Sequence, residues 1–391
     1  MMQRKILRPW LVLALALTPV LLGGCSLLGR GGDEAVDPPA ELPDFEPERE
    51  VERLWQVDIG DGPAAREDGL QLALGGARLF AATPDGKVLA LSTETGEQLW
   101  RVDLDRRLTG GPAAGLSLVV VGSADGEVFA LDPETGEQRW QARVTSEVVA
   151  PPAVSPGAVV VRALDGRVTA FTADGEQRWE YRSPVPALTL RGASAPLIEA
   201  GVAVIGLDNG RLVGIEIGSG RVLWEQVLSL PSGRSEVERL ADVDATPAIR
   251  GTEIYAVGYQ GRLLNIGLQT GQPRWSRDVS SAIGITASGA MLYVVDDRSR
   301  VLALDRLSGG SLWRQEALYR RQLTAPAATG EGAVVGDYEG YLHWLHPADG
   351  RPIARYRLDG DGITAPPLVG ADRVFALGRG GKLAALRLAA D

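Results

Sequence analysis

The sequence contains one cysteine and two histidines among 391 residues, and this scarcity excludes several kinds of chemistry. A disulfide within the chain, a cysteine-based zinc site and an iron–sulfur cluster each need at least two thiols. His343 and His346 lie three residues apart in an expected strand, where side chains point to opposite faces, so we expect no shared metal ion. No P-loop, Gly-x-Ser-x-Gly or His-Glu-x-x-His motif is present. We therefore predict a protein that is not an enzyme and that uses neither a metal nor a cofactor.

Clusters of positive charge are also missing. The chain has 40 Lys and Arg residues against 50 Asp and Glu residues, which gives a formal net charge of −10. Nucleic-acid binding needs basic side chains gathered on one surface to neutralise phosphates, so we exclude it. A hydrophobic fraction of 45% and a charged fraction of 23% are typical of a folded globular body with a sizeable core.

The one long apolar run extends from Trp10 to Leu22 and follows three basic residues. It is shorter than the roughly 20 residues that a membrane-spanning helix needs, and it matches the apolar region of a secretory signal. Residues 22–25, Leu-Gly-Gly-Cys, resemble the lipobox of bacterial lipoproteins. That resemblance implies cleavage before Cys25 and lipidation (palmitate among the acyl groups) of this cysteine, with Ser26 favouring the outer membrane.

This motif divides the chain into three parts. Residues 1–24 are assigned to a cleaved lipoprotein signal peptide. Residues 25–50, which are rich in Gly, Pro and acidic residues and show little hydrophobic periodicity, are assigned to the lipidated cysteine and a flexible tether. Residues 51–391 remain for the folded body.

A pattern of about 40 residues recurs along this body. Its clearest copy runs from Asp125 to Trp140 and contains an Asp-Gly turn between two apolar runs, which is a strong hairpin signal. A seventh copy carries Ala354 where the tryptophan is expected. Repeats of 40–45 residues with about four strands each are typical of β-propeller blades. The tryptophans in register are Trp55, Trp100, Trp140, Trp179, Trp224, Trp275 and Trp313.

The two ends of the body supply parts of one further copy. The last copy begins at Gly380 and stops before its tryptophan strand, whereas the strand around Trp55 has no copy before it. We therefore predict an all-β, eight-bladed β-propeller with four antiparallel strands per blade, closed by the N-terminal strand, which completes the last blade. The seven tryptophans are expected to fill space between neighbouring blades rather than to stack on a ligand.

Two links between blades are unusually long. The distance from the tryptophan to the proline that recurs at the start of the next blade is 12 or 13 residues in four links, but 17 for Trp179–Pro196 and 23 for Trp224–Pro247. Because such links emerge on one face of a propeller, the two enlarged ones lie side by side there. They contain leucines, an arginine and a pair of aspartates, which favours a protein-docking surface. The alternative, that these links only pack on themselves, stays open.

The repeat at 130–140, Ala-Leu-Asp-x-x-Thr-Gly-x-x-x-Trp, resembles the PQQ-type repeat of quinoprotein dehydrogenases. The whole chain is similar to the BamB family of outer-membrane protein assembly factors, most closely at residues 190–196, 239–247 and 336–344. That resemblance implies a non-enzymatic scaffold lipoprotein of the β-barrel assembly machinery, anchored to the cell outer membrane and facing the periplasm. It implies docking on the periplasmic POTRA domains of BamA and help in the folding and insertion of outer-membrane β-barrel proteins. The BamA-docking residues that it implies are Leu188, Leu190, Arg191, Asp242 and Asp244.

Two other functions are considered beside this one. A PQQ-dependent quinoprotein dehydrogenase shares the repeat, but this chain lacks the long insertions and the vicinal cysteine pair common in such enzymes. A generic periplasmic ligand-binding propeller is the second alternative. The sequence leaves open whether unfolded outer-membrane proteins touch the chain directly.

Overall fold

The computed structural model describes residues 37–65, 68–115, 117–190, 194–231, 234, 235 and 239–390. The chain divides into residues 1–38 and one compact unit of residues 39–391, and the fold described here is that of the second unit. Every regular element among the described residues is a β-strand, and none of these residues belongs to a helix able to span a bilayer. Cys25, the predicted lipid anchor, lies outside the described residues.

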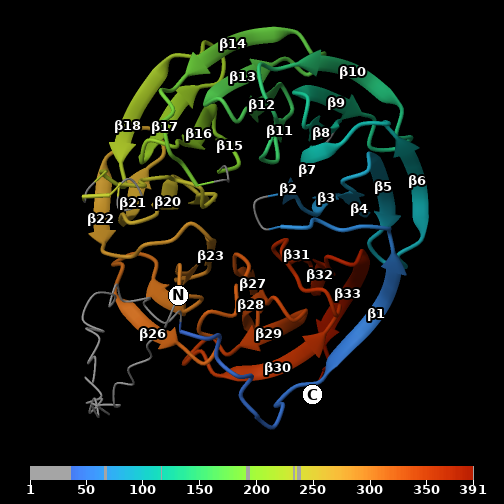
Figure 1. Cartoon of the computed structure of the whole chain (residues 1–391), viewed down its shortest axis with the longest axis vertical. Helices are drawn as coiled ribbons and strands as arrows, with labels where there is room; N and C mark the ends of the chain where they lie inside the picture. The colour runs from blue at the N-terminus through green and yellow to red at the C-terminus, as the bar shows by residue number, and fades with distance from the viewer. Residues whose placement is uncertain are drawn as a thin grey trace, which may run out of the picture. The chain divides into compact units, whose positions relative to one another are not determined.

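The strands form eight sheets arranged around a common centre, as Figure 1 shows. We number these sheets as blades 1 to 8 in chain order. Blade 1 consists of β3 (Ala73–Gly75), β4 (Arg78–Ala82), β5 (Lys87–Ser92) and β6 (Gln98–Asp103), and blade 2 of β7 (Leu108–Ala114), β8 (Val119–Ser123), β9 (Glu127–Leu131) and β10 (Gln138–Arg143). Blade 3 consists of β11 (Ala153–Ser155), β12 (Ala158–Arg162), β13 (Arg167–Phe171) and β14 (Gln177–Arg182), and blade 4 of β15 (Leu197–Glu199), β16 (Val202–Gly206), β17 (Arg211–Glu216) and β18 (Val222–Val227).

Blades 5 to 8 repeat the same order from the centre outward. Blade 5 consists of β19 (Ala248–Arg250), β20 (Glu253–Val257), β21 (Leu263–Gly267) and β22 (Pro273–Arg277), and blade 6 of β23 (Gly284–Ser288), β24 (Met291–Val295), β25 (Val301–Asp305) and β26 (Ser311–Gln315). Blade 7 consists of β27 (Ala327–Thr329), β28 (Gly332–Gly336), β29 (Tyr341–Leu345) and β30 (Pro352–Arg357), and blade 8 of β31 (Leu368–Gly370), β32 (Arg373–Leu377), β33 (Lys382–Leu388) and β1 (Val51–Asp58). The predicted eight-bladed, antiparallel propeller is therefore confirmed. One sheet has an addition, because β2 (Gly69–Leu70) pairs in parallel with β7 in blade 2.

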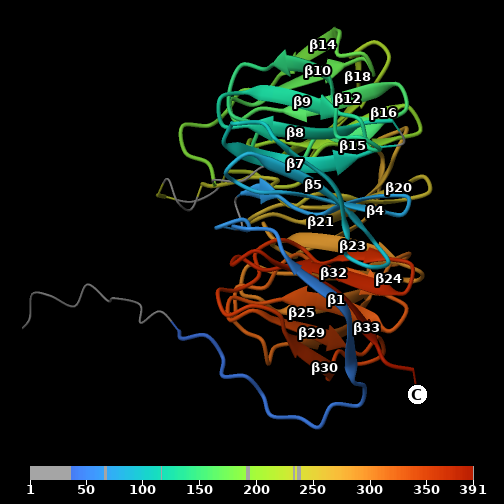
Figure 2. The ribbon, with the colours of Figure 1, turned by 90° about the vertical axis from the view of Figure 1, so that its right-hand side faces the viewer.

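The two ends of the ring meet in blade 8, as the sequence predicted. The first strand, β1, pairs antiparallel with β33, from Val51 opposite Leu388 to Asp58 opposite Lys382. Figure 2 shows these two strands side by side at the edge of the ring. The pairing is continuous apart from one bulge between Arg53 and Trp55, and it joins the first strand of the chain to the last one, which closes the ring.

The tryptophans of the outer strands join each blade to the next. The indole Nε1 of Trp224, for example, donates to the carbonyl oxygen of Leu268 in blade 5 at 2.7 Å. The ring lies against Gly271, whose φ is +66° and where an added Cβ would stand 2.5 Å from Cβ and Cγ of Trp224. The indoles of Trp55, Trp100, Trp140, Trp179, Trp275 and Trp313 make equivalent bonds to the carbonyls of Thr93, Pro133, Ala173, Ile217, Arg306 and Pro347.

Blade 7 departs from this rule for a structural reason. Its outer strand carries the fully buried Ala354 at the tryptophan position, and the large ring of this blade is the buried Trp344 on β29. Each tryptophan elsewhere docks on the turn between the third and fourth strands of the following blade. Blade 8 has no such turn, because its third and fourth strands belong to opposite ends of the chain. An indole at position 354 would therefore find no carbonyl of a hairpin turn to bind.

The predicted flexible tether needs a correction for residues 39–50. The backbone N–H of Ala40 donates to the carbonyl of Tyr319, and the N–H groups of Glu48 and Arg49 donate to the carbonyl of Ile353. These residues are thus bound to blade 7 in an extended form. The sequence gives no signal for these contacts, because residues 39–50 follow the surface of blade 7 and have no repeat pattern of their own.

Candidate docking face

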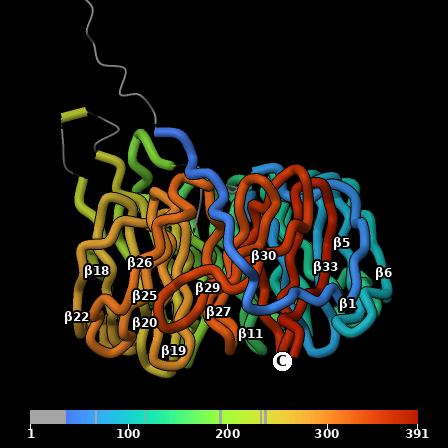
Figure 3. The backbone as a smooth tube through the Cα atoms, turned by 90° about the horizontal axis from the view of Figure 1, so that it is seen from below, coloured from blue at the N-terminus to red at the C-terminus, as the bar shows by residue number. Residues whose placement is uncertain are grey.

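The two enlarged links emerge on the same side of the ring. Residues 183–196 connect β14 to β15, and residues 228–247 connect β18 to β19. Because neighbouring strands in a blade are antiparallel, the links between blades share their side with the turns that join the second and third strands. Figure 3 shows the described parts of both links rising above this side. We call it the docking face, and the other side of the ring the opposite face.

The predicted docking residues have different positions on this face. Leu188 is exposed over 44% of its surface, whereas Asp242 is exposed over only 1%. An oxygen (Oδ2) of Asp242 accepts a hydrogen bond from the backbone N–H of Leu190 at 2.6 Å. Asp242 therefore holds one enlarged link against the other from within. Arg191, the remaining predicted residue of that link, lies outside the described residues.

A buried group of charges lies beneath the links. The guanidinium of Arg162, at the end of β12, forms an ion pair with Asp208, and Arg162 is only 1% exposed. One oxygen each of Asp242 and Asp244 and two nitrogens of Arg162 are buried without a hydrogen-bond partner among the described residues. Blades 3 and 4 and the second enlarged link thus contribute to one polar cluster, in which three carboxylates face a single cation.

The pKa values of both link carboxyls follow from this arrangement. Burial raises the pKa of Asp242 to about 6, although the hydrogen bond from Leu190 acts in the opposite direction. Burial, together with the charge of Asp242, raises the pKa of Asp244 to about 7 against the opposing attraction of Arg162. In each case the uncharged form gains relative to the charged one, since water is excluded and one cation cannot compensate three anions. The cluster is therefore sensitive to pH near neutrality.

Four large apolar side chains are exposed on the docking face, in the two enlarged links and in the β12–β13 turn. Leu230 is exposed over 66% of its surface and Leu188 over 44%, and Leu164 and Val185 are each 39% exposed. A methyl group of Val185 lies 2.5 Å from where a Cβ on Gly166 would stand, which brings it beside the β12–β13 turn that carries Leu164. We call Leu164, Val185, Leu188 and Leu230 the apolar patch. Exposed apolar surface of this kind is typical of protein-interaction sites.

Sequence reasoning did not select all of these residues. It included Leu230 in an enlarged link without assigning it a role, and it missed Leu164 and Arg162. A signal for Arg162 exists in the repeat, since the second strands of blades 1, 2 and 4 end in Ala82, Ser123 and Gly206. The other second strands also end in uncharged residues, so the charge of Arg162 marks a local departure from the repeat.

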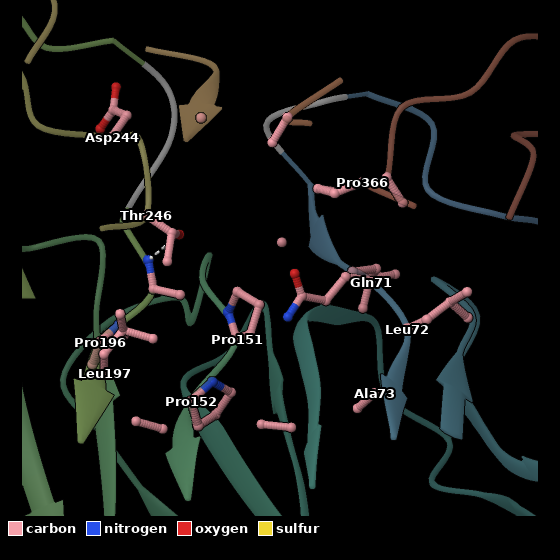
Figure 4. A pocket seen from close by; sticks show the side chains of 18 of the residues that line it. Gln71, Leu72, Ala73, Pro151, Pro152, Pro196, Leu197, Asp244, Thr246 and Pro366 are labelled. Carbon is pink, nitrogen blue, oxygen red and sulfur yellow. Dashed lines mark hydrogen bonds between the residues drawn. The ribbon is translucent and has the colours of Figure 1, made fainter. Parts of the chain in front are cut away.

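The enlarged links also border a cavity of about 920 Å³ at the centre of the ring. Its walls come from the innermost strands and the residues before them, and they are mostly apolar, as Leu72, Pro152 and Pro196 show in Figure 4. Leu190 and Asp244 belong to the lining. Within the described part of the chain, no group of three or more His, Cys, Asp or Glu side chains is placed to hold a metal ion.

Comparison with known proteins identifies relatives over the full length of the ring. The model of the family described as "Outer membrane protein assembly factor BamB" matches residues 48–107, 84–315 and 298–390. The outer membrane protein assembly factor BamB of Pseudomonas aeruginosa is 46% identical over 375 residues, which cover 96% of this chain and 97% of that protein.

Solved structures agree with this likeness. The crystal structure of BamB from Moraxella catarrhalis superposes with a TM-score of 0.79 at 26% identity and covers 86% of this chain and 99% of that one. The quinohemoprotein alcohol dehydrogenase of Comamonas testosteroni superposes with a TM-score of 0.66 at 14% identity, over 86% of this chain and 76% of that one. The second likeness is one of fold alone.

Proposed function

Because the chain belongs to the family of the outer membrane protein assembly factor BamB, we propose that it is a scaffold lipoprotein of the β-barrel assembly machinery at the outer membrane. In this role it has no catalytic activity and assists the folding and insertion of outer-membrane β-barrel proteins by holding a partner in place. The partner we propose is the periplasmic POTRA region of BamA. The observation that supports docking is the apolar patch, which two enlarged neighbouring links present on one face.

The predicted docking residues divide into two roles under this proposal. Leu188 and the remainder of the apolar patch contact the partner directly, because their side chains are exposed. Asp242 acts indirectly, since it is buried and holds the backbone of Leu190. Replacing Asp242 with lysine would bring a second cation beside Arg162 in a buried site and disturb the links themselves. Loss of binding in that variant would therefore not identify a contact residue.

Exposed leucines allow a sharper test. The double variant Leu188→Asp and Leu230→Asp places charge in the apolar patch without touching the buried cluster. Burying one leucine contributes about 1.5–3 kcal/mol, so loss of two such contacts is expected to weaken BamA binding by at least ~100-fold. The assay is co-purification of BamA with the chain from solubilised outer membranes, followed by titration with the purified POTRA region.

A matched control is available on the opposite face. Leu307 is 65% exposed in the β25–β26 turn, so Leu307→Asp places a charge on a leucine as exposed as Leu230 but away from the patch. We expect Leu307→Asp to bind BamA as the native chain does. Equal binding by the patch variant and the control would contradict the assignment of the docking face.

We further propose that lipid groups on Cys25 anchor the chain to the outer membrane, with the ring in the periplasm. The support is the apolar run followed by Leu-Gly-Gly-Cys at residues 22–25, together with the outer-membrane name shared by the relatives. A lipid-anchored scaffold stays within reach of a membrane partner, which raises its effective concentration there.

A further inference from the structure

Residues 39–50, which we call the strap, cross blade 7 from one face of the ring to the other. At the opposite face, Glu48 forms an ion pair with Arg351 in the β29–β30 turn at 2.8 Å, and Arg49 forms one with Glu331 in the β27–β28 turn at 3.0 Å. At the docking face, the N–H of Ala40 donates to the carbonyl of Tyr319, which lies in the link between blades 6 and 7. Figure 3 shows the strap climbing from one side of the ring to the other.

Two arginines of the ring bind the middle and upper parts of the strap. The Arg321 guanidinium donates from Nη1 to the carbonyl of Ala40 at 2.9 Å. Arg355 on β30 donates from Nη2 to the carbonyl of Pro43 at 2.8 Å, and its guanidinium lies 4.9 Å from the centre of the Phe45 ring. Such a contact is attractive because the positive charge lies against the electron-rich face of the ring. These parts of the strap are thus held by backbone carbonyls and by one aromatic side chain.

A buried network fixes the position of the upper arginine. Nε of Arg321 donates to Oδ2 of Asp337 at 2.9 Å, and Nε2 of His343 lies 3.0 Å from the same oxygen. Arg321, Asp337 and His343 are all buried, and Arg321 also pairs with Glu339. Since the network pre-orders the guanidinium, binding of the strap carbonyl costs little side-chain entropy. The upper end of the strap therefore has a built binding site.

From this path we propose that the strap directs the docking face toward the membrane. Chain connectivity makes residue 39 the point from which the tether leaves the ring, and this point lies on the docking face. The inference rests on the proposed lipid anchor at Cys25. Without the strap the tether would leave the ring at residue 50, beside the seam of blade 8 where Glu50 accepts the N–H of Ala389 on the opposite face.

The strap also reduces the number of residues between Cys25 and the ring. Residue 39 stands 14 positions after Cys25, whereas residue 50 stands 25 positions after it. Even when fully extended, 14 residues reach at most about 50 Å, whereas 25 residues reach about 90 Å. The strapped ring therefore stays closer to the bilayer and presents the apolar patch to partners that lie at the membrane side.

Vesicles carrying the full lipidated chain, without BamA, test this orientation. A fluorophore is attached to an introduced cysteine, either Leu188→Cys on the docking face or Leu307→Cys on the opposite face, and quenched by nitroxide-labelled headgroups. Acylation of Cys25 leaves the introduced thiol as the one that reacts. We expect quenching at position 188 to exceed that at position 307 at least twofold. Equal quenching in the native chain would overturn the inference.

Two matched variants separate the strap from the length of the tether. Replacing residues 39–48 with a Gly/Ser segment of equal length, together with Arg49→Ser, removes the side-chain contacts of Phe45, Glu48 and Arg49. The segment also becomes flexible, so holding its backbone against the ring costs more entropy, and the quenching at the two positions is expected to become equal. The same replacement at residues 27–36 keeps the strap and is expected to retain the difference. A difference that survives the first replacement would show that the strap does not set the orientation.

The outcome is distinguishable from a failure of the docking proposal. BamA is absent from the vesicles, so loss of docking cannot change the quenching, and docking is measured separately by co-purification. A chain that does not associate with vesicles would overturn both the lipid anchor and this inference. The docking face is tested by the co-purification assay and does not depend on that result. Unchanged tryptophan fluorescence in both Gly/Ser variants checks that the ring is intact.

Discussion

Replacing Asp242 with asparagine is expected to stabilise the protein at neutral and alkaline pH. The amide oxygen of asparagine can still accept the N–H of Leu190, so the bond between the two enlarged links is kept. The substitution removes a buried negative charge. In the native chain the carboxylates of Asp242, Asp244 and Asp208 have a single cation, Arg162, to compensate them. Asp242→Ala differs, because it leaves the Leu190 N–H without this acceptor, and we expect it to be less stable than the asparagine variant by about 1–3 kcal/mol.

The magnitude follows from the pKa of Asp242, which burial raises from 3.8 to about 6. A raised carboxyl pKa means that the folded protein binds more protons than the unfolded chain between these two values. Stability from this group is therefore fully present below about pH 4 and is lost as the pH rises through 6. Two pKa units correspond to about 3 kcal/mol. Removing the charge also relieves Asp244, whose pKa the charge of Asp242 helps to raise.

The assay is urea denaturation followed by tryptophan fluorescence at pH values from 4 to 8. We expect the unfolding free energy of Asp242→Asn to exceed that of the native chain by about 3 kcal/mol more at pH 8 than at pH 4. The control is Asp174→Asn, which removes an exposed carboxylate from the β13–β14 turn. A difference between Asp242→Asn and the native chain that stays constant across this pH range would refute the reasoning.

The remaining predictions concern the blade contacts and the anchor. Gly271→Ala is expected to lower the free energy of unfolding by about 3 kcal/mol, because φ at this position is +66° and the new Cβ would meet Trp224. The control Gly218→Ala, whose Cβ would have no atom within 4 Å, is expected to change stability little. Trp224→Ala, which removes the indole of the same contact, is expected to cost about 3–5 kcal/mol, and equal denaturation midpoints for the two glycine variants would contradict the role of this contact. Cys25→Ser, expressed behind a signal peptide whose cleavage does not need this cysteine, is expected to move the chain from the outer-membrane fraction to the soluble periplasmic fraction, and a cleaved chain that still fractionates with the membrane would argue against a lipid anchor at this residue.

Much of the ring is predictable from the sequence because its signals are local. Each blade is a set of short hairpins whose turns carry glycine at positive φ, as at Gly126 and Gly136, and whose strands are apolar runs. A repeat multiplies such signals, so the period of the tryptophans reveals the number of blades. The closure by β1 is also predictable, since a strand without a preceding copy and a copy without its last strand can pair only with each other.

The docking face was predictable only in outline. The lengths of two links located it, and the family resemblance named residues on it, but neither distinguishes the exposed Leu188 from the buried Asp242. The partner of Asp208 is Arg162, which comes from another blade and is 46 positions away. The links lie outside the repeat, so they have no regular pattern of apolar and polar residues from which the inward-pointing side chains could be predicted.

The sequence by itself therefore determined the blades, their number and the strand that closes the ring, because hairpin turns and repeated packing positions are encoded within some 40 residues. The tertiary structure decided which charges are buried together and where residues 39–50 lie. Burial and pairing of these groups depend on surfaces contributed by distant parts of the chain. Arg355, for example, donates to the carbonyl of Pro43 and packs against Phe45, each more than 300 positions away. Contacts of that kind follow from the shape of the finished ring, on which both the strap and the docking face are built.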